Sequence, residues 1–215
     1  MMIIKTFTVN PLQENCYVVS DETHEAVIID CGAYYDEELT AISNYIETNG
    51  LHPVAHLLTH AHFDHILGAG YIYNRYKLAA RMHPSDMDMF LHASSQPPVF
   101  MQLKAFHRDF GPAGEPVDVS EPITFGNHSL SVHFTPGHTT GGVCYYCADE
   151  RILFSGDNLF AQSIGRTDFP GGDYTQLITA LQKLMAALPD DVKIYPGHGP
   201  VTTAATERCY NPYLR

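Results

Sequence analysis

The strongest constraint on this chain is one arrangement that occurs four times: a short apolar run, a turn, and then side chains of the kind that bind metal ions. The first run, 54–58, leads into Thr59-His60-Ala61-His62-Phe63-Asp64-His65. The other three lead into Thr135-Pro136-Gly137-His138, Ser155-Gly156-Asp157 and Pro196-Gly197-His198. If these runs are strands of one layered structure, their carboxyl ends gather at one edge, where loops carry function over a rigid scaffold. The sequence therefore predicts a site built from four loops.

Within the first of these segments, the spacing favours convergence on a metal ion. Positions i and i+2 of an extended chain project to the same side, so His60 and His62 can reach one cation. Asp64 lies on that side one step further along, and His65, which we expect to open a helix, turns its ring towards a second cation. A single histidine is usually an ordinary surface or core residue. Five histidines and two aspartates placed in this way favour a metal site.

Elsewhere, short apolar runs alternate with amphipathic helices, which predicts an α/β or mixed fold. Nine strands are expected, at Ile3–Val9, Cys16–Ser20, Ala26–Ile29, Val54–Leu58, Leu78–Arg81, Ser129–Phe134, Val143–Tyr146, Ile152–Phe154 and Lys193–Tyr195. One helix is expected to begin at Asp36, as its cap, and to end at Asn49-Gly50. Another is expected after Asp173 and Gln176, whose spacing resembles a capping box, and before Pro189.

The length of 215 residues suits a single domain, 1–215, with a sizeable core. The region from about 83 to 121 is rich in Met, Phe, His and Pro and has weak helical periodicity. We interpret it as an insertion that covers a site, with a plain connecting segment as the alternative.

Charge and cysteine content narrow the function classes. The net charge is −12 with histidines counted as neutral, and two divalent cations would leave about −8, so nucleic acid is not an expected partner. Five scattered cysteines favour a reduced protein. Cys144 and Cys147 lie in an expected strand, where positions three apart face opposite sides and do not pair. No signal peptide or membrane span is visible, so we expect a soluble, cytoplasmic protein that acts on a small molecule.

The motif Thr-His-x-His-x-Asp-His, followed by Thr-Pro-Gly-His, Ser-Gly-Asp and Pro-Gly-His, resembles the signature of the metallo-β-lactamase superfamily over nearly the whole chain. This resemblance implies an αββα sandwich: two mixed sheets flanked by helices, with a two-metal site at one edge. The ligands so implied are His60, His62 and His138 for the first ion, Asp64, His65 and His198 for the second, and Asp157 bridging the two. The resemblance also implies that Asp30 supports these ligands from behind.

Within that superfamily, the segments 156–160, 163–173 and 197–200 are similar to short proteins of the glyoxalase II (hydroxyacylglutathione hydrolase) type. The resemblance implies a thioesterase for substrates such as S-lactoylglutathione. Arg166 stands where the longer enzymes place a basic residue against glutathione, and an ion pair with Asp168 is the alternative for it. The chain departs from those enzymes at Asp168 and Pro200, where they have glutathione-binding tyrosines, and with 215 residues it is not expected to contain their helical glutathione-binding domain.

The chemistry implied is hydrolysis by a water whose pKa two divalent ions lower, with attack on a thioester carbonyl. Zinc is the expected metal, with iron or manganese as alternatives, and Asp64 and Asp157 are the expected catalytic carboxylates. A mononuclear iron persulfide dioxygenase is the rival, because that family shares the fold and a stretch like Gly165–Asp168. A hydrolase of an unrelated ester or lactone is the other alternative. A β-lactamase is disfavoured, since it would need export.

Overall fold

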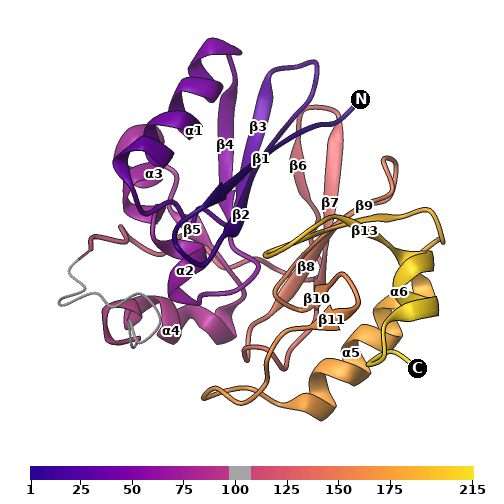
Figure 1. Cartoon of the computed structure of the whole chain (residues 1–215). Coiled ribbons are helices and arrows are strands. Elements are labelled where there is room, and N and C mark those ends of the chain that lie inside the picture. Colours follow the sequence, from indigo (N-terminus) through magenta and orange to yellow (C-terminus); the bar gives the residue numbers. More distant parts are fainter. Residues whose placement is uncertain (97–107) are drawn as a thin grey trace.

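A computed structural model of the chain describes residues 1–96 and 108–215. Two β-sheets pack face to face, and helices lie on the outer face of each sheet (Figure 1). The helices α1 and α3 cover the sheet of the N-terminal half, and α5 and α6 cover the sheet of the C-terminal half (Figure 1). The αββα sandwich expected from the sequence is confirmed.

The first sheet has five strands in sequence order. They are β1 (Ile3–Val9), β2 (Glu14–Ser20), β3 (Glu25–Ile29), β4 (His52–Leu57) and β5 (Ala80–Arg81). The pairs among β1, β2 and β3 are antiparallel, whereas β3 pairs parallel with β4, and β4 with β5. Parallel neighbours need a crossover, which α1 (Asp36–Thr48) supplies between β3 and β4, and α2 (Phe63–Ile66) with α3 (Ala69–Tyr76) supplies between β4 and β5.

The second sheet has the order β13-β12-β9-β8-β7-β6. Its strands are β6 (Ile123–Phe125), β7 (His128–Phe134), β8 (Val143–Cys147), β9 (Ile152–Gly156), β12 (Lys193–Pro196) and β13 (Thr202–Thr203). The parallel pair is β9 with β12, joined through α5 (Tyr174–Ala187), and α6 (Ala204–Tyr210) closes the chain. A separate ribbon of β10 (Leu159–Phe160) and β11 (Ser163–Ile164) follows β9. None of the helices in the described ranges is long and apolar enough to cross a membrane.

The alternation of side chains along the strands builds the layers. Tyr17 and Val19 of β2 pack between the sheets, whereas Val18 faces the helices over the first sheet. In the same way Cys147 packs between the sheets and Cys144 packs against α5 on the other face of β8. The prediction that these two cysteines point to opposite faces is confirmed, and both are free thiols.

Two expected helix starts are wrong, one by one residue and the other by two. Tyr35, not Asp36, occupies the position before α1. The helix expected to open at His65 is two helices, of which α2 begins at Phe63 and α3 at Ala69. The break has a physical cause: the Gly68 N–H donates to the carbonyl of Cys31, and Asp64 O, its usual helical acceptor, takes the Asn10 side-chain amide instead.

The region 83–121, expected as an insertion or lid, falls partly outside the described residues, since 97–107 are not described. Its first part forms η1 (Pro84–Asp86), α4 (Met87–Leu91) and η2 (Ala93–Ser95). Phe90 and Ala93 are buried in one cluster with Leu58, Ala61 and Ile66. This part of the region therefore packs directly against the first histidine-rich segment.

Candidate metal centre

The loops after β4, β7, β9 and β12 bring the seven expected ligand side chains to one edge of the sandwich. Among the described residues, three overlapping groups place their possible ligand atoms within 4.8 Å of one another. These groups are His60, His62 and His138; Asp64, His65 and His198; and Asp30, His60 and His65. The first two are the sets that the family resemblance implied.

Asp157 lies between the two predicted sets. Its Oδ1 is 3.2 Å from His65 Nε2, and its Oδ2 is 3.5 Å from His198 Nε2 and 3.8 Å from His138 Nε2. Asp64 Oδ2 is 3.2 Å from His198 Nε2. A carboxylate within reach of both sets has the place that a bridging ligand needs.

Backbone hydrogen bonds tie the ligand loops to neighbouring segments. The Val143 N–H donates to Thr59 O at 2.9 Å, which ties the second sheet to the first ligand segment. The Gly197 N–H donates to Gly156 O at 2.9 Å. Position 197 has no room for a side chain, because a Cβ there would lie 2.2 Å from Asp157 Oδ1. The glycine before His198 thus lets the last loop approach the bridging carboxylate.

Three of the histidines are oriented by partners at Nδ1, so that Nε2 turns inwards. His138 Nδ1 lies 2.7 Å from Arg166 O, His198 Nδ1 lies 3.0 Å from Leu12 O, and His65 Nδ1 lies 3.1 Å from an Asp30 oxygen. Each partner is an acceptor, so in the neutral imidazole Nδ1 carries the hydrogen and Nε2 keeps its lone pair. Such outward hydrogen bonds fix the tautomer of metal-binding imidazoles.

Buried nitrogen and oxygen atoms without partners test whether a cation fits here. His60 Nε2, His65 Nε2 and Asp157 Oδ1 are buried and make no hydrogen bond with the described residues. His62 Nδ1 and His138 Nε2 face each other at 2.9 Å, and the Arg166 contact already fixes the hydrogen of His138 on its other nitrogen. Unsatisfied buried polar atoms are costly and rare. Inward-facing acceptors of this kind are satisfied by a divalent cation, so the residues fit the metal that the motif implies.

The first group is prepared to bind as neutral imidazoles. Burial and the neighbouring histidines hold the pKa of His60 well below its ordinary value. Burial, together with His138, lowers the pKa of His62 to about 3. Neutral imidazole is the form that binds metals, so this group needs no deprotonation near neutral pH.

The second group holds opposite charges in contact. Burial alone would raise the pKa of Asp157, but the positive charges of His65 and His198 outweigh burial and lower it. Burial would lower the pKa of His65, but Asp157, Asp64 and Asp30 outweigh it and raise the pKa well above its ordinary value. Without a cation, protonated imidazoles therefore balance the two carboxylates.

Arg166, the expected substrate contact, makes one set of contacts with its side chain and another with its backbone carbonyl. Its guanidinium makes a two-point ion pair with Asp168, at 2.8 Å for each bond, and lies 3.7 Å from the centre of the Phe169 ring. The Phe169 ring centre is 5.9 Å from that of His62. Phe169 therefore lies between the Arg166 side chain and His62. The backbone carbonyl of Arg166, as described above, holds His138.

Asp30 is where the sequence placed it, behind the ligands. It accepts hydrogen bonds from the Thr59 N–H at 2.7 Å and the Thr59 hydroxyl at 2.6 Å, besides its contact with His65. Two further buried carboxylates, Glu14 and Asp86, were not singled out in the sequence. Burial raises the pKa of Glu14 well above its usual range. Glu14 could have been found from the sequence, because it is an acidic residue just before the apolar run 16–20.

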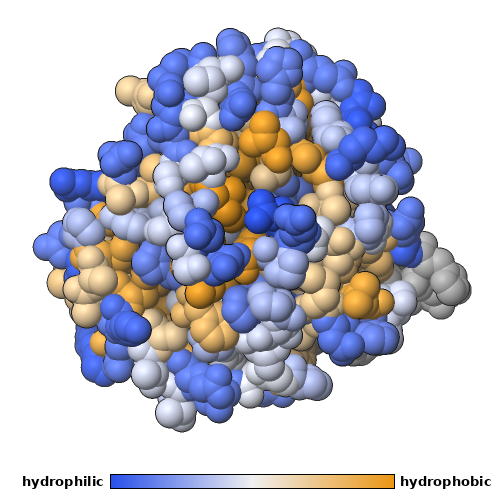
Figure 2. Space-filling view, turned by 180° about the vertical axis from the view of Figure 1, so that it is seen from behind, coloured by the Kyte–Doolittle hydropathy of each residue, from blue (hydrophilic) through white to orange (hydrophobic). Residues whose placement is uncertain are grey.

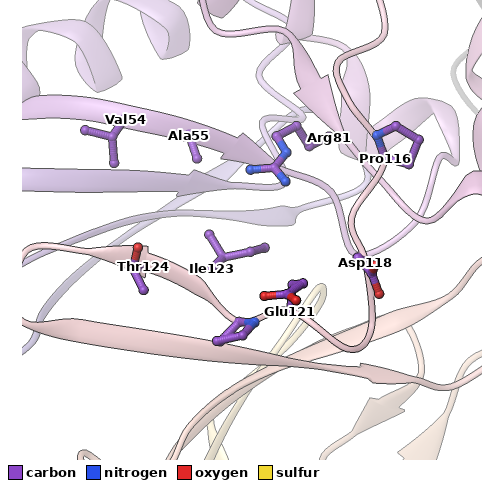
Figure 3. Close-up of a pocket in the computed structure, with 9 residues that line it drawn as sticks. Val54, Ala55, Arg81, Pro116, Asp118, Glu121, Ile123 and Thr124 are labelled. Atoms are coloured by element: carbon purple, nitrogen blue, oxygen red, sulfur yellow. The ribbon is translucent and has the colours of Figure 1, made fainter.

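A cavity of about 380 Å³ lies elsewhere in the molecule (Figure 3). It is lined by Val54, Ala55, Arg81, Pro116, Asp118, Glu121, Pro122, Ile123 and Thr124 and shares no residue with the histidine cluster. Its charged groups are of both signs, and Arg81 already donates to Glu115 O at 3.3 Å. The back face also carries apolar patches that hydrophilic residues interrupt near its centre (Figure 2). Neither feature gathers groups for catalysis, so the histidine cluster remains the candidate centre.

Comparisons with known proteins agree with this geometry. "Probable metallo-hydrolase YqgX" of Bacillus subtilis is 35% identical over 207 residues, covering 96% of this chain and 94% of that protein. "Hydroxyacylglutathione hydrolase GloC" of Haemophilus influenzae is 32% identical over 219 residues, covering 99% of this chain and 98% of that protein. Similarity along the full length of both relatives means that the match includes all four ligand loops.

Solved structures of similar proteins share the architecture. BLEG-1, described as a B3 metallo-beta-lactamase, superimposes with a TM-score of 0.86 at 35% identity and 99% coverage of both chains. TTHA1623 in a di-iron-bound form superimposes with a TM-score of 0.85 at 34% identity, covering 98% of this chain and all of that one. The family model of the metallo-beta-lactamase superfamily matches residues 9–198, a range that begins before β2 and ends at the last predicted ligand. This chain therefore belongs to the metallo-beta-lactamase superfamily.

Proposed function

We propose that the protein is a hydrolase with two metal ions that cleaves a thioester of the S-lactoylglutathione type. The observation that carries this proposal is the pair of ligand groups that converge on Asp157 from both sides. We assign His60, His62 and His138 to one ion, Asp64, His65 and His198 to the other, and Asp157 to both. When bound, divalent ions lower the pKa of a water molecule and polarise a carbonyl group.

The donor set supports zinc as the metal. All seven ligands offer nitrogen or oxygen, and the cysteines of the chain are absent from every ligand group found among the described residues. Zinc accepts such sets, and so do iron and manganese. TTHA1623 in its di-iron-bound form supports iron as the alternative.

The protein residues orient the water and move its proton. Asp64 and Asp157 lie on the same side of His198, and both carboxylates have a lowered pKa, so they are ionised and can accept hydrogen bonds from a nucleophilic water. For Asp64, burial would raise the pKa, and the charge of His65 and the bond to His198 outweigh it. An ionised carboxylate beside the nucleophile serves as its orienting group and proton relay. A thiolate leaves without much protonation, so no separate acid is required.

Similarity to GloC and the placement of Arg166 support the thioester substrate. Arg166 stands one aromatic ring from His62 and can offer a guanidinium fork to a substrate carboxylate. Asp168 and Pro200 replace the tyrosines that grip glutathione in longer enzymes of this type. The similarity to BLEG-1 and the lack of these tyrosines make an unrelated ester, lactone or lactam the alternative substrate.

A mononuclear iron persulfide dioxygenase is the second candidate. It is favoured by the stretch Gly165–Asp168, which resembles that family, and by the fact that the same histidines could hold a single iron ion. Such an enzyme would consume oxygen, whereas the hydrolase would not.

The test is metal analysis combined with a thioester assay. Protein purified without chelators, stripped and reloaded with zinc should bind two ions per chain and hydrolyse S-lactoylglutathione. His62→Ala should abolish this activity. His52→Ala, at an exposed histidine on the far end of β4, is the matched control and should retain it. A single ion after reloading, with oxygen consumed on glutathione persulfide, would replace the hydrolase by the dioxygenase.

A further inference from the structure

Asp86 is a buried carboxylate surrounded by hydrogen-bond donors from two different loops. It lies at the end of η1 and is fully buried. One oxygen accepts from the Ala61 N–H at 3.1 Å and from the Thr139 hydroxyl at 2.8 Å. The other accepts from the Gly141 N–H at 2.6 Å and from the Thr140 hydroxyl at 3.4 Å. The Thr140 hydroxyl is also 3.0 Å from Ser85 O, so the short contacts to Asp86 come from the other three donors. Three such donors on one carboxylate make a strong, directional junction.

These donors belong to the loops that carry the three-histidine group. Ala61 lies between His60 and His62, and Thr139 follows His138 directly. The first loop leaves β4 in one sheet, and the second leaves β7 in the other. A single side chain thus ties together the two loops whose histidines must meet at one ion.

The contact is tight enough to set positions. A Cβ added at Gly141 would lie 2.6 Å from the Asp86 carboxylate carbon, so the second loop approaches as closely as a backbone can. The helical turns after Asp86 are anchored as well, since Gln96 donates to Ala61 O and accepts from the Phe63 N–H. Residues 84–96 therefore form a brace against the first loop.

The other ligand group is held by different contacts. His65 depends on Asp30 and His198 depends on Leu12 O, and no hydrogen bond or ion pair in the described ranges joins Asp86 to either histidine. A change at Asp86 should therefore alter the metal affinity of the three-histidine group more than that of the other group.

We propose that Asp86 is a positioning residue that sets the geometry of His60, His62 and His138, and so controls metal affinity at that group and not at the other. This inference rests on the metal ligands assigned under the proposed function. It gives part of the region 83–121 a role in building the metal centre.

The test compares Asp86→Asn in two single-site backgrounds. An amide has one acceptor oxygen, so either Ala61 or Gly141 must present its N–H to an NH₂ group. With His198→Ala disabling the second group, Asp86→Asn should weaken zinc binding at the three-histidine group by about 10- to 100-fold. With His62→Ala disabling the first group, the same change should alter the remaining affinity by less than about twofold. Affinities are measured on purified protein by competition with a chromophoric chelator.

Control variants separate positioning from a general loss of structure. Asp118→Asn, at an exposed carboxylate of the same region that accepts from Ser120, should leave both affinities unchanged. Thr139→Val removes one donor and should weaken the three-histidine group in the same direction by a smaller factor. Thr139→Ser keeps the hydroxyl and should restore the affinity. If Asp86→Asn does not fold, the comparison is made between Thr139→Val and Thr139→Ser instead.

The outcomes distinguish the inference from the proposed function. Wild-type protein that binds no zinc overturns both. Suppose instead that the wild-type protein binds two ions, but Asp86→Asn or Thr139→Val lowers the zinc affinity equally in both backgrounds or in neither. The metal centre is then supported, and the role of Asp86 is overturned.

Discussion

The change Asp30→Asn should weaken one metal site with little alteration of shape. Asp30 is buried and adopts a positive φ of 50°, a conformation that asparagine tolerates as well as aspartate does. Its two oxygens accept three hydrogen bonds, two from Thr59 and one from His65 Nδ1. An asparagine has one acceptor oxygen. If that oxygen keeps the Thr59 N–H, the new NH₂ faces His65 and can no longer accept its hydrogen.

The magnitude follows from the lost bond. His65 must then give up its hydrogen at Nδ1 and carry it on Nε2, the atom that faces Asp157 and that we assign to the metal. A hydrogen bond to a charged group is worth about 1.5–3 kcal/mol. At about 1.4 kcal/mol for each tenfold change, the affinity of the second site should fall by about 10- to 150-fold. The three-histidine group should lose less, because only one of its members, His60, lies close to Asp30.

The chain offers a matched control for this experiment. Asp21 is also buried and also holds a histidine, with its Oδ2 3.0 Å from His128 Nδ1. His128 begins β7, the strand whose other end leads to the ligand loop of His138. Asp21→Asn should therefore cost stability of the same kind while leaving metal binding intact. Stepwise cobalt titration followed by absorbance reports the two sites, and urea unfolding of metal-free protein reports stability.

Two results would refute this reasoning. If Asp30→Asn and Asp21→Asn lose similar stability and both keep wild-type cobalt titrations, Asp30 serves the fold alone. If Asp30→Asn weakens both sites equally, its contact with Thr59, which precedes His60, matters more than its contact with His65.

Three further predictions concern the bridging carboxylate, the Arg166 side chain and a buried histidine outside the metal centre. Asp157→Ala should deplete both metal sites and remove nearly all hydrolysis, whereas His198→Ala should empty mainly the second site; metal analysis showing the same selective loss in both would contradict the grouping. Arg166→Ala should raise KM for the thioester by about tenfold, the effect of one lost bidentate contact of about 1.4 kcal/mol; an equal defect in Asp168→Ala would mean that Arg166 only braces its loop. Burial lowers the pKa of His56 to about 3, so below pH 6.5 the unfolded chain binds a proton that the folded chain does not, and stability falls as pH drops towards 3. His56→Leu should reduce the stability lost between pH 7 and 5 by about 2 kcal/mol in urea titrations of metal-free protein.

Much of the site was predictable because its pattern is local. The spacing of His60, His62, Asp64 and His65 places these side chains through backbone geometry alone, and the structure brings them together as expected. The strands that lead into the ligand loops were found for the same reason, since each is an apolar run of several residues. The short strands β6, β10, β11 and β13 were missed, because two or three residues carry no periodicity.

The contacts that connect distant segments were not predictable. Asp86 sits in a Pro-Ser-Asp turn, and nothing near it in sequence shows that its carboxylate accepts bonds from residues 61 and 141. The break between α2 and α3 has the same origin, because Cys31 and Asn10 take over the hydrogen bonds of the helix there. In both cases tertiary hydrogen bonds override the local preference.

The loop that carries Arg166 allows substrate binding to be tested apart from the metal centre. The carbonyl of Arg166 holds His138, while its side chain points to Asp168 and Phe169. Truncating the side chain leaves the carbonyl in place, so Arg166→Ala should change KM without moving His138. The preceding residue is different: a Cβ at Gly165 would lie 1.8 Å from Asp157 O and 2.8 Å from His138 Nδ1. A substitution there would disturb the ligands themselves, so we expect Gly165→Ala to impair metal binding, whereas Arg166→Ala should leave it unchanged.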